Sequence, residues 1–145
     1  MKRHPSLQSL SRDHHAVLSL ANRLQRDPND QRLREFLDLW SRDLEAHFEE
    51  EERLLAKLVK PADGERLLRE HARIRQFATA AARGMFDLSD VVRLGDILRT
   101  HVRWEERHLF PYIEQNASEA ELSEIGRSTG PGPIRPLQTE FLSLS

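Results

Sequence analysis

One motif occurs twice in this chain, and it constrains the fold more than any other feature. The segments HFEEEERLL at 47–55 and HVRWEERHL at 101–109 both match the pattern H-x-x-x-E-E-R-x-L. A shorter motif precedes each copy: Asp13-His14-x-x-Val17 before the first and Glu70-His71-x-x-Ile74 before the second. Each half of the chain therefore carries an acid next to a histidine, and then a second histidine with a glutamate four residues later.

The four-residue spacing places the histidine and the glutamate of each copy on one face of a helix. His47 and Glu51 fall within the apolar stripe of their segment, and His101 and Glu105 fall within the stripe of theirs. The apolar members of these stripes are Trp40, Leu44, Leu54 and Leu58 in the first segment, and Leu94 and Leu98 in the second. A glutamate in a helical core is costly unless it is paired or binds a cation, and two facing glutamates repel each other. The pattern therefore predicts cations between the helices.

The spacing of apolar residues and the positions of helix-breaking residues predict four helices joined by short turns. The first covers about 6–26 and ends at the turn cluster 27–30, in which an Asp or Asn can cap the next helix. The second covers about 30–59, the third follows a break at 60–64 and reaches about 83, and the fourth runs from 87 or 89 past 112. Gly84 suits the stop of the third helix, and Pro111 should kink or loosen the end of the fourth. Short connections between long helices predict an all-α fold, an antiparallel up-down-up-down four-helix bundle.

At 145 residues the chain fits one domain with a substantial core. We assign 1–117 to the bundle and 118–145 to a C-terminal extension with one short helix and a tail containing Pro and Gly. The apolar end of this tail is a candidate for docking on the bundle or on a partner. The net charge of -2 predicts no nucleic-acid surface, and no segment has the apolar length of a signal peptide or a membrane span. A cytoplasmic location is therefore the default expectation.

Side-chain chemistry limits the cations that such a site would take. The chain has seven histidines and no cysteine, which excludes disulfides, thiolate ligands and a cysteine nucleophile. Imidazoles and carboxylates without sulfur suit iron or manganese, with zinc as an alternative. Of the two adjacent histidines near the N-terminus we select His14, because it matches His71 in the repeat. His15 points about 100° away and is expected at the surface or edge.

These motifs resemble those of the hemerythrin-like, or HHE cation-binding, family. The resemblance covers roughly residues 7–112 and includes the segment EERHLFP at 105–111. It implies a four-helix bundle with a non-haem di-iron centre, in which two carboxylates bridge the irons. The implied ligands are His14 and His47 for one iron, His71 and His101 for the other, and Glu51 and Glu105 as the bridges.

The third helix departs from the pattern of the oxygen-carrying hemerythrins, which the chain resembles in other respects. Those proteins carry H-x-x-x-H on this helix, whereas the second position here is Arg75. Because arginine cannot ligate iron, one metal would lose an imidazole, which argues against simple reversible oxygen carriage. The alternative is that Arg75 turns to the edge of the bundle and pairs with an acid such as Glu70 or Glu106.

Further residues are expected to act around the ligands. Asp13 and Glu70 are candidates for orienting imidazole N–H groups, although both also suit positions that face solvent. His108, seven residues after His101, is either a supporting or replacement ligand or, as we favour, an edge residue. An apolar wall that limits solvent access is expected from Leu18, Leu44, Ile74 and Leu98.

The expected function is a di-iron site that binds dioxygen, peroxide or nitric oxide, for sensing, detoxification or iron handling. A metal- or oxygen-binding protein is favoured over an enzyme, and no catalytic residue is predicted. Three alternatives stay open: a zinc-stabilised structural bundle, a metal-free interaction bundle, and a ferritin-like di-iron oxidase. For the last of these, Glu105-x-x-His108 is the only useful Glu-x-x-His motif. Homo-oligomerisation and partner binding through the tail are also open.

Overall fold

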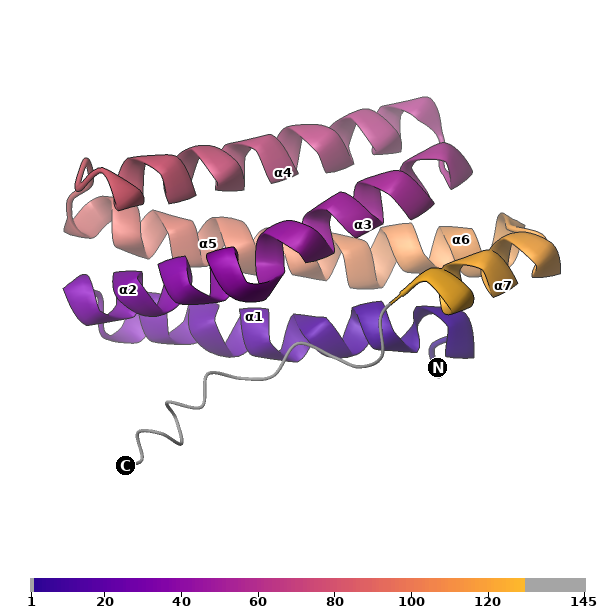
Figure 1. Ribbon diagram of the computed structural model, residues 1–145, viewed down its shortest axis with the longest axis horizontal. Helices are drawn as coiled ribbons and strands as arrows, with labels where there is room; N and C mark the ends of the chain where they lie inside the picture. The colour runs from indigo at the N-terminus through magenta and orange to yellow at the C-terminus, as the bar shows by residue number, and fades with distance from the viewer. Residues whose placement is uncertain (1, 130–145) are drawn as a thin grey trace.

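The computed structural model describes residues 2–129, and this part of the chain is helical, without strands. The main helices are α1 (Gln8–Arg26), α2 (Asp30–Leu39), α3 (Glu45–Leu55), α4 (Pro61–Ala82), α5 (Leu88–Trp104) and α6 (Phe110–Asn116). They form long rods that lie side by side, with α2 continuing into α3 and α5 into α6 (Figure 1). The predicted all-α class is therefore confirmed as a helical bundle. None of the described helices is both long and apolar enough to cross a membrane.

Local sequence explains where the first two rods begin and end. A 3-10 turn, η1 (Pro5–Leu7), precedes α1, which ends at Arg26 with Asp27 as its C-cap. The side chain of Asn29 then accepts a hydrogen bond from the Arg32 backbone N–H and caps α2, which confirms the predicted cap. The second rod is not one continuous α-helix. A π-helix, η2 (Trp40–Leu44), joins α2 to α3, and a 3-10 turn, η3 (Ala56–Leu58), follows α3.

The third rod begins earlier than predicted. α4 starts at Pro61 directly after Lys60, so the expected break over 60–64 is wrong in its length. Proline suits the first position of a helix, because the N–H that it lacks would have no helical partner there. At the other end, Gly84 follows α4 with a φ of 71°, in the left-handed region that favours glycine. This confirms Gly84 as the stop of the helix.

The fourth rod is interrupted near Pro111, as predicted. Asp87 begins α5 with a capping box that includes Asp90. A second π-helix, η4 (Glu105–Leu109), separates α5 from α6, and Pro111 lies in the first turn of α6. The wider turn therefore lies where a proline removes one of the usual helical hydrogen bonds.

Two apolar clusters fill the bundle. One includes most of the predicted apolar wall: Leu44, Ile74 and Leu98 are fully buried in it, and Leu18 packs against it while only partly buried. The other cluster includes Leu7, Leu10, Leu54, Leu55, Leu67, Leu109 and Phe110. The two clusters share no residue.

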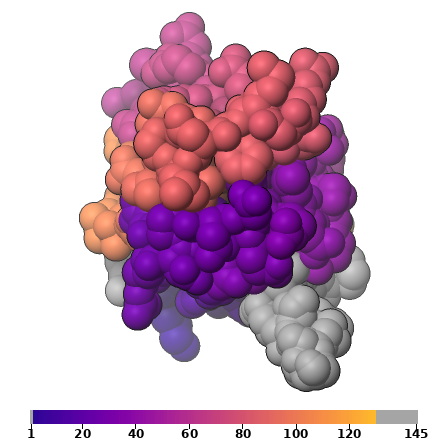
Figure 2. All heavy atoms as spheres, turned by 90° about the vertical axis from the view of Figure 1, so that its left-hand side faces the viewer, coloured from indigo at the N-terminus to yellow at the C-terminus, as the bar shows by residue number. Residues whose placement is uncertain are grey.

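α1 and α5 approach each other closely at Gly95. A Cβ atom at this position would lie 2.8 Å from the backbone oxygen of Ala21, so a larger residue would push the two helices apart. Figure 2 shows the bundle from the end at which the turns 27–29 and 83–87 lie, and the atoms around these turns cover it.

α7 (Glu119–Ser128) lies beside the start of the chain (Figure 1). Ser118 caps it with a capping box, and Leu122 and Ile125 are buried in the second apolar cluster. This is the short helix predicted after residue 117. The predicted docking of the tail falls on residues 130–145, outside the described residues, and the division into 1–117 and 118–145 stays a prediction.

Candidate metal centre

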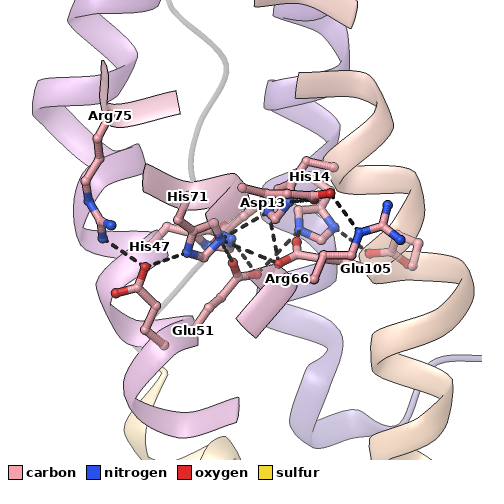
Figure 3. A network of polar contacts seen from close by, with 12 residues as sticks. Asp13, His14, His47, Glu51, Arg66, His71, Arg75 and Glu105 are labelled. Carbon is pink, nitrogen blue, oxygen red and sulfur yellow. Dashed lines mark hydrogen bonds and ion pairs between the residues drawn. The ribbon is translucent and has the colours of Figure 1, made fainter. Parts of the chain in front are cut away.

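Six buried polar side chains meet between the rods, and they are the six predicted as metal ligands. α1 contributes His14, α3 contributes His47 and Glu51, α4 contributes His71, α5 contributes His101, and η4 begins with Glu105. Each of the six residues is at most 5 % exposed. Their polar ends point toward one another, as the labelled members in Figure 3 show. We call this set the His/Glu cluster.

Aromatic rings cover the His/Glu cluster on its apolar sides. Phe48 stacks on the ring of His71 with a centroid distance of 3.8 Å and an angle of 3° between the planes. Phe110 stacks on the ring of His14 at 5.5 Å. Both phenylalanines belong to the apolar clusters, so these contacts hold two of the imidazole planes and exclude water from them.

The two glutamates of the cluster each face both pairs of histidines. The shortest contacts are Glu51 Oε2 to His47 Nε2 at 3.0 Å, Glu51 Oε1 to His71 Nε2 at 3.2 Å, Glu105 Oε1 to His14 Nε2 at 2.8 Å, and Glu105 Oε2 to His101 Nε2 at 3.2 Å. One oxygen of each carboxylate is thus directed to the histidines of the first half of the chain and the other to those of the second half. This is the arrangement that a carboxylate shared between two ions requires.

A second carboxylate holds each imidazole from outside through Nδ1. The pairs are His14 with Glu106 at 2.6 Å, His47 with Asp13 at 2.8 Å, His71 with Glu52 at 2.8 Å, and His101 with Glu70 at 2.7 Å. An ionised carboxylate only accepts hydrogen bonds, so each Nδ1 is the nitrogen that donates. The orienting role predicted for Asp13 and Glu70 is confirmed. Each Nε2 atom is left facing the interior, as in imidazoles that bind metals.

With Nδ1 protonated and Nε2 bare, the atoms that face the interior are all acceptors. Within residues 2–129, the oxygens of Glu51 and Glu105 and the Nε2 atoms of His14 and His47 are buried without a hydrogen-bond partner. The Nε2 atoms of His71 and His101 lie only 3.1 Å apart. Such acceptors repel one another unless positive charge lies between them, either from metal ions or from further protons on the imidazoles.

Protons supply this positive charge when no metal is bound. Burial lowers the pKa of His47, but the charge of Glu51 and the hydrogen bond with Asp13 outweigh burial and raise the pKa to about 9. Burial likewise lowers the pKa of His71, but the nearby carboxylates of Glu105, Glu51 and Glu52 raise it to about 10. Burial and the charge of Glu105 act to raise the pKa of Glu51, yet the neighbouring imidazoles hold it at about 2. The metal-free cluster is therefore a set of buried ion pairs.

Metal binding should release protons from this cluster. The folded pKa values of His47 and His71 lie above the ordinary 6.5, so the stability they contribute to the metal-free protein is complete below about pH 6.5 and is lost as the pH rises through about 9 and 10. A divalent cation that binds both Nε2 atoms at neutral pH must displace both protons. We therefore expect at least two protons released per chain when Mn²⁺ is added, measured by calorimetry in buffers that differ in ionisation enthalpy.

His15→Ala is the control for proton release, because it removes an exposed imidazole beside the cluster and should leave the number of protons unchanged. A binding heat that does not depend on the buffer would contradict the assigned protonation of the metal-free cluster.

Arg75 lies at the edge of the His/Glu cluster and does not enter it (Figure 3). Its Nη2 donates a hydrogen bond to Glu52 Oε2 at 3.0 Å, and its side chain is 33 % exposed. The alternative in which Arg75 turns to the edge of the bundle and pairs with an acid is confirmed, but the acids named as examples, Glu70 and Glu106, are not its partners. Both of those acids hold other imidazoles, whereas Glu52 on α3 faces the side of α4 that carries Arg75.

The remaining histidines near the site face outward. His15 is exposed while His14 is buried, so the surface position expected for His15 is confirmed. The side chain of His108 is 53 % exposed, and its Nε2 lies 3.0 Å from Asp63 Oδ2. In a continuous α-helix, a residue seven positions after His101 would lie near the same face, but the wider turn of η4 rotates His108 away. The motif considered for a ferritin-like oxidase therefore has no inward-facing histidine.

Glu52 and Glu106 act on the cluster, although the sequence analysis did not single them out for this role. Each is the second glutamate of the E-E doublet in the repeated motif. Glu52 of the first half holds His71 of the second half, and Glu106 of the second half holds His14 of the first. The E-E doublet could have identified both residues from the sequence. The residue directly after a buried glutamate lies about 100° further around the helix, so it projects toward a neighbouring helix.

Four imidazoles and two glutamates buried in a helical bundle define a protein built to hold cations. Their candidate ligand atoms form two groups, and all atoms within a group lie within 4.8 Å of one another: Glu51, His71, His101 and Glu105 in one, and His14, His47 and Glu51 in the other. The chain belongs to the hemerythrin HHE cation binding domain family, whose model matches residues 6–113. Neither the curated proteins nor the solved structures gave a match. The family match confirms the resemblance read from the motifs.

Proposed function

We propose that the His/Glu cluster holds two iron ions within an antiparallel up-down-up-down four-helix bundle. The proposed ligands are His14 and His47 for one ion, His71 and His101 for the other, and Glu51 and Glu105 as bridges. The observation that carries this proposal is the direction of the glutamate oxygens, one toward each histidine pair. Each ion would then receive two nitrogens and two oxygens, a set without sulfur that suits iron.

The charge around the cluster supports two metal ions. Six carboxylates take part: the two glutamates of the cluster and the four acids that hold the Nδ1 atoms. Among the described residues, three arginines lie against these outer acids: Arg3, Arg66 and Arg75. With neutral imidazoles, the carboxylates of Glu51 and Glu105 would keep their negative charges in a fully buried volume. Two divalent or trivalent cations would offset them.

The proposed ions would bind dioxygen or a related small molecule such as peroxide or nitric oxide, for sensing, detoxification or iron handling. Four protein donors for each ion leave positions for a small external ligand. Phe48 and Phe110 against the imidazoles, together with the two apolar clusters, keep bulk water from the cluster. Since Arg75 stays outside the cluster, the donor set differs from that expected of an oxygen carrier.

Metal analysis combined with an optical spectrum tests the proposal. Protein purified from iron-replete cells should contain two iron ions per chain and should show the near-ultraviolet absorption of a coupled ferric pair. The spectrum of the anaerobically reduced protein should change when dioxygen is added. Bound zinc with a silent spectrum would favour a structural role for the metal, and protein without bound metal would refute the proposal.

A further inference from the structure

Three arginines lie directly outside the carboxylates that hold the imidazoles. The contacts are Arg3 Nη2 to Glu106 Oε1 at 3.1 Å, Arg66 Nε to Glu70 Oε2 at 2.7 Å, and Arg75 Nη2 to Glu52 Oε2 at 3.0 Å. Each of these carboxylates also accepts a hydrogen bond from the Nδ1 atom of a cluster histidine. The sequence of contacts from imidazole to carboxylate to guanidinium therefore occurs three times. We call Arg3, Arg66 and Arg75 the arginine layer.

The arginine layer lies at the border between the buried cluster and solvent. The three arginine side chains are 19 %, 37 % and 33 % exposed, whereas the imidazoles behind them are almost inaccessible. Arg66 and Arg75 flank His71 on α4, five residues before it and four after it. Glu52 links an imidazole and an arginine most directly, because its single Oε2 atom accepts hydrogen bonds from both His71 and Arg75.

A guanidinium on the far side of a carboxylate influences the imidazole in two ways. First, a charge-assisted hydrogen bond fixes the carboxylate, which in turn fixes the plane of the ring. Second, the positive charge weakens the pull of the carboxylate on the Nδ1 proton, which limits how strongly Nε2 donates to a metal. Removal of the guanidinium charge should make Nε2 a stronger donor to a metal. A stronger donor should stabilise the more oxidised form of the bound metal.

We propose that the residues of the arginine layer are positioning residues of the metal centre, which orient the imidazoles and raise the reduction potential of the centre. The effect on the potential rests on the proposed iron site, whereas the orienting effect does not require metal. This assigns a role to Arg75, the residue that stands in place of a third-helix histidine. It acts on His71 through Glu52 and not as a ligand.

Arg75→Gln tests the proposal, with Arg23→Gln as the matched control. Arg23 pairs with Glu35 at 3.2 Å, and their side chains are 31 % and 18 % exposed, close to the 33 % and 21 % of Arg75 and Glu52. Glu35, however, holds no imidazole of the cluster. In the iron-loaded protein, we expect Arg75→Gln to keep both ions and to shift the midpoint reduction potential downward. Arg75→Lys retains the charge and should recover most of the wild-type potential, and Arg23→Gln should leave the potential unchanged.

A second measurement uses the metal-free protein. In samples with ¹⁵N-labelled histidine, the Nδ1–H signal of His71 should shift in Arg75→Gln. The signal of His47, which Asp13 holds, should stay in place. Arg23→Gln should shift neither signal.

The outcomes separate the two proposals. An unchanged His71 signal in Arg75→Gln, or an equal change in Arg23→Gln, would overturn the orienting role. A potential that is unchanged or raised in Arg75→Gln would overturn the tuning role. If the wild-type protein binds no iron, the proposed function fails, and the nitrogen signals still decide whether Arg75 positions His71.

Discussion

Replacing Glu51 by glutamine should remove both metal ions from the protein, not only one. Glutamine keeps the length and shape of the side chain, but its single oxygen can face only one histidine pair, and its NH₂ group would face the other. Loss of an acid that merely holds a metal ligand commonly costs about 10–100-fold in affinity. We therefore expect loss of a shared ligand to cost more than about 100-fold. Competition with a chelator followed by metal analysis measures this effect.

Glu49→Gln is the matched control, because Glu49 is exposed on the same helix and its replacement should leave both ions bound. Glu105→Gln makes the equivalent change in the second copy of the motif and should behave like Glu51→Gln. Circular dichroism of each variant should show the wild-type helix content, so that loss of metal is not mistaken for loss of fold. Retention of two ions per chain in Glu51→Gln or Glu105→Gln would reject the bridging role.

His14→Ala should lower the metal content from two ions per chain toward one. The substitution removes one of the two imidazoles in the first half of the cluster, and it also leaves Glu105 Oε1 without its nearest partner, which lies at 2.8 Å. The second half keeps His71 and His101 together with one oxygen from each glutamate. Iron or manganese content after loading and desalting measures the change.

His15→Ala provides a control one residue away, because His15 is exposed and contributes nothing to the cluster. Both ions should stay bound in this variant. If His15→Ala lowered the metal content while His14→Ala did not, the assignment of the first ligand would be wrong.

The sequence predicted the inward-facing residues of the site well, because their positions follow from helical periodicity. The choice of His14 over His15 needed only the match with His71 in the repeat and the 100° step of a helix. Helix limits at Asn29 and Gly84 were also predictable, since a cap or a left-handed stop is a local property of one or two residues. The start of α4 at Pro61 was missed because proline was taken as a break, although it also favours the first helical position.

Features that depend on how neighbouring helices face each other were not predictable in the same way. The pairing of Glu52 with both His71 and Arg75 requires the rotation of α3 relative to α4, which no single-helix pattern contains. An edge position was favoured for His108 from the sequence and is confirmed, but the rotation that produces it comes from η4, a π-helix that no single-helix pattern predicts. For the same reason, the acids named as examples of partners for Arg75 are not its partners, although its position at the edge of the bundle is confirmed.

The exchange of contacts between the two halves of the chain has a consequence for assembly. Glu52 of the first half of the chain contacts His71 of the second half, and Glu106 of the second half contacts His14 of the first. Glu51 and Glu105 each face histidines of both halves of the chain, so a bound pair of ions would connect segments far apart in sequence. Removal of the ions would then weaken the contact between the two halves of the chain. Metal binding would therefore increase the stability of the contact between the two halves of the molecule.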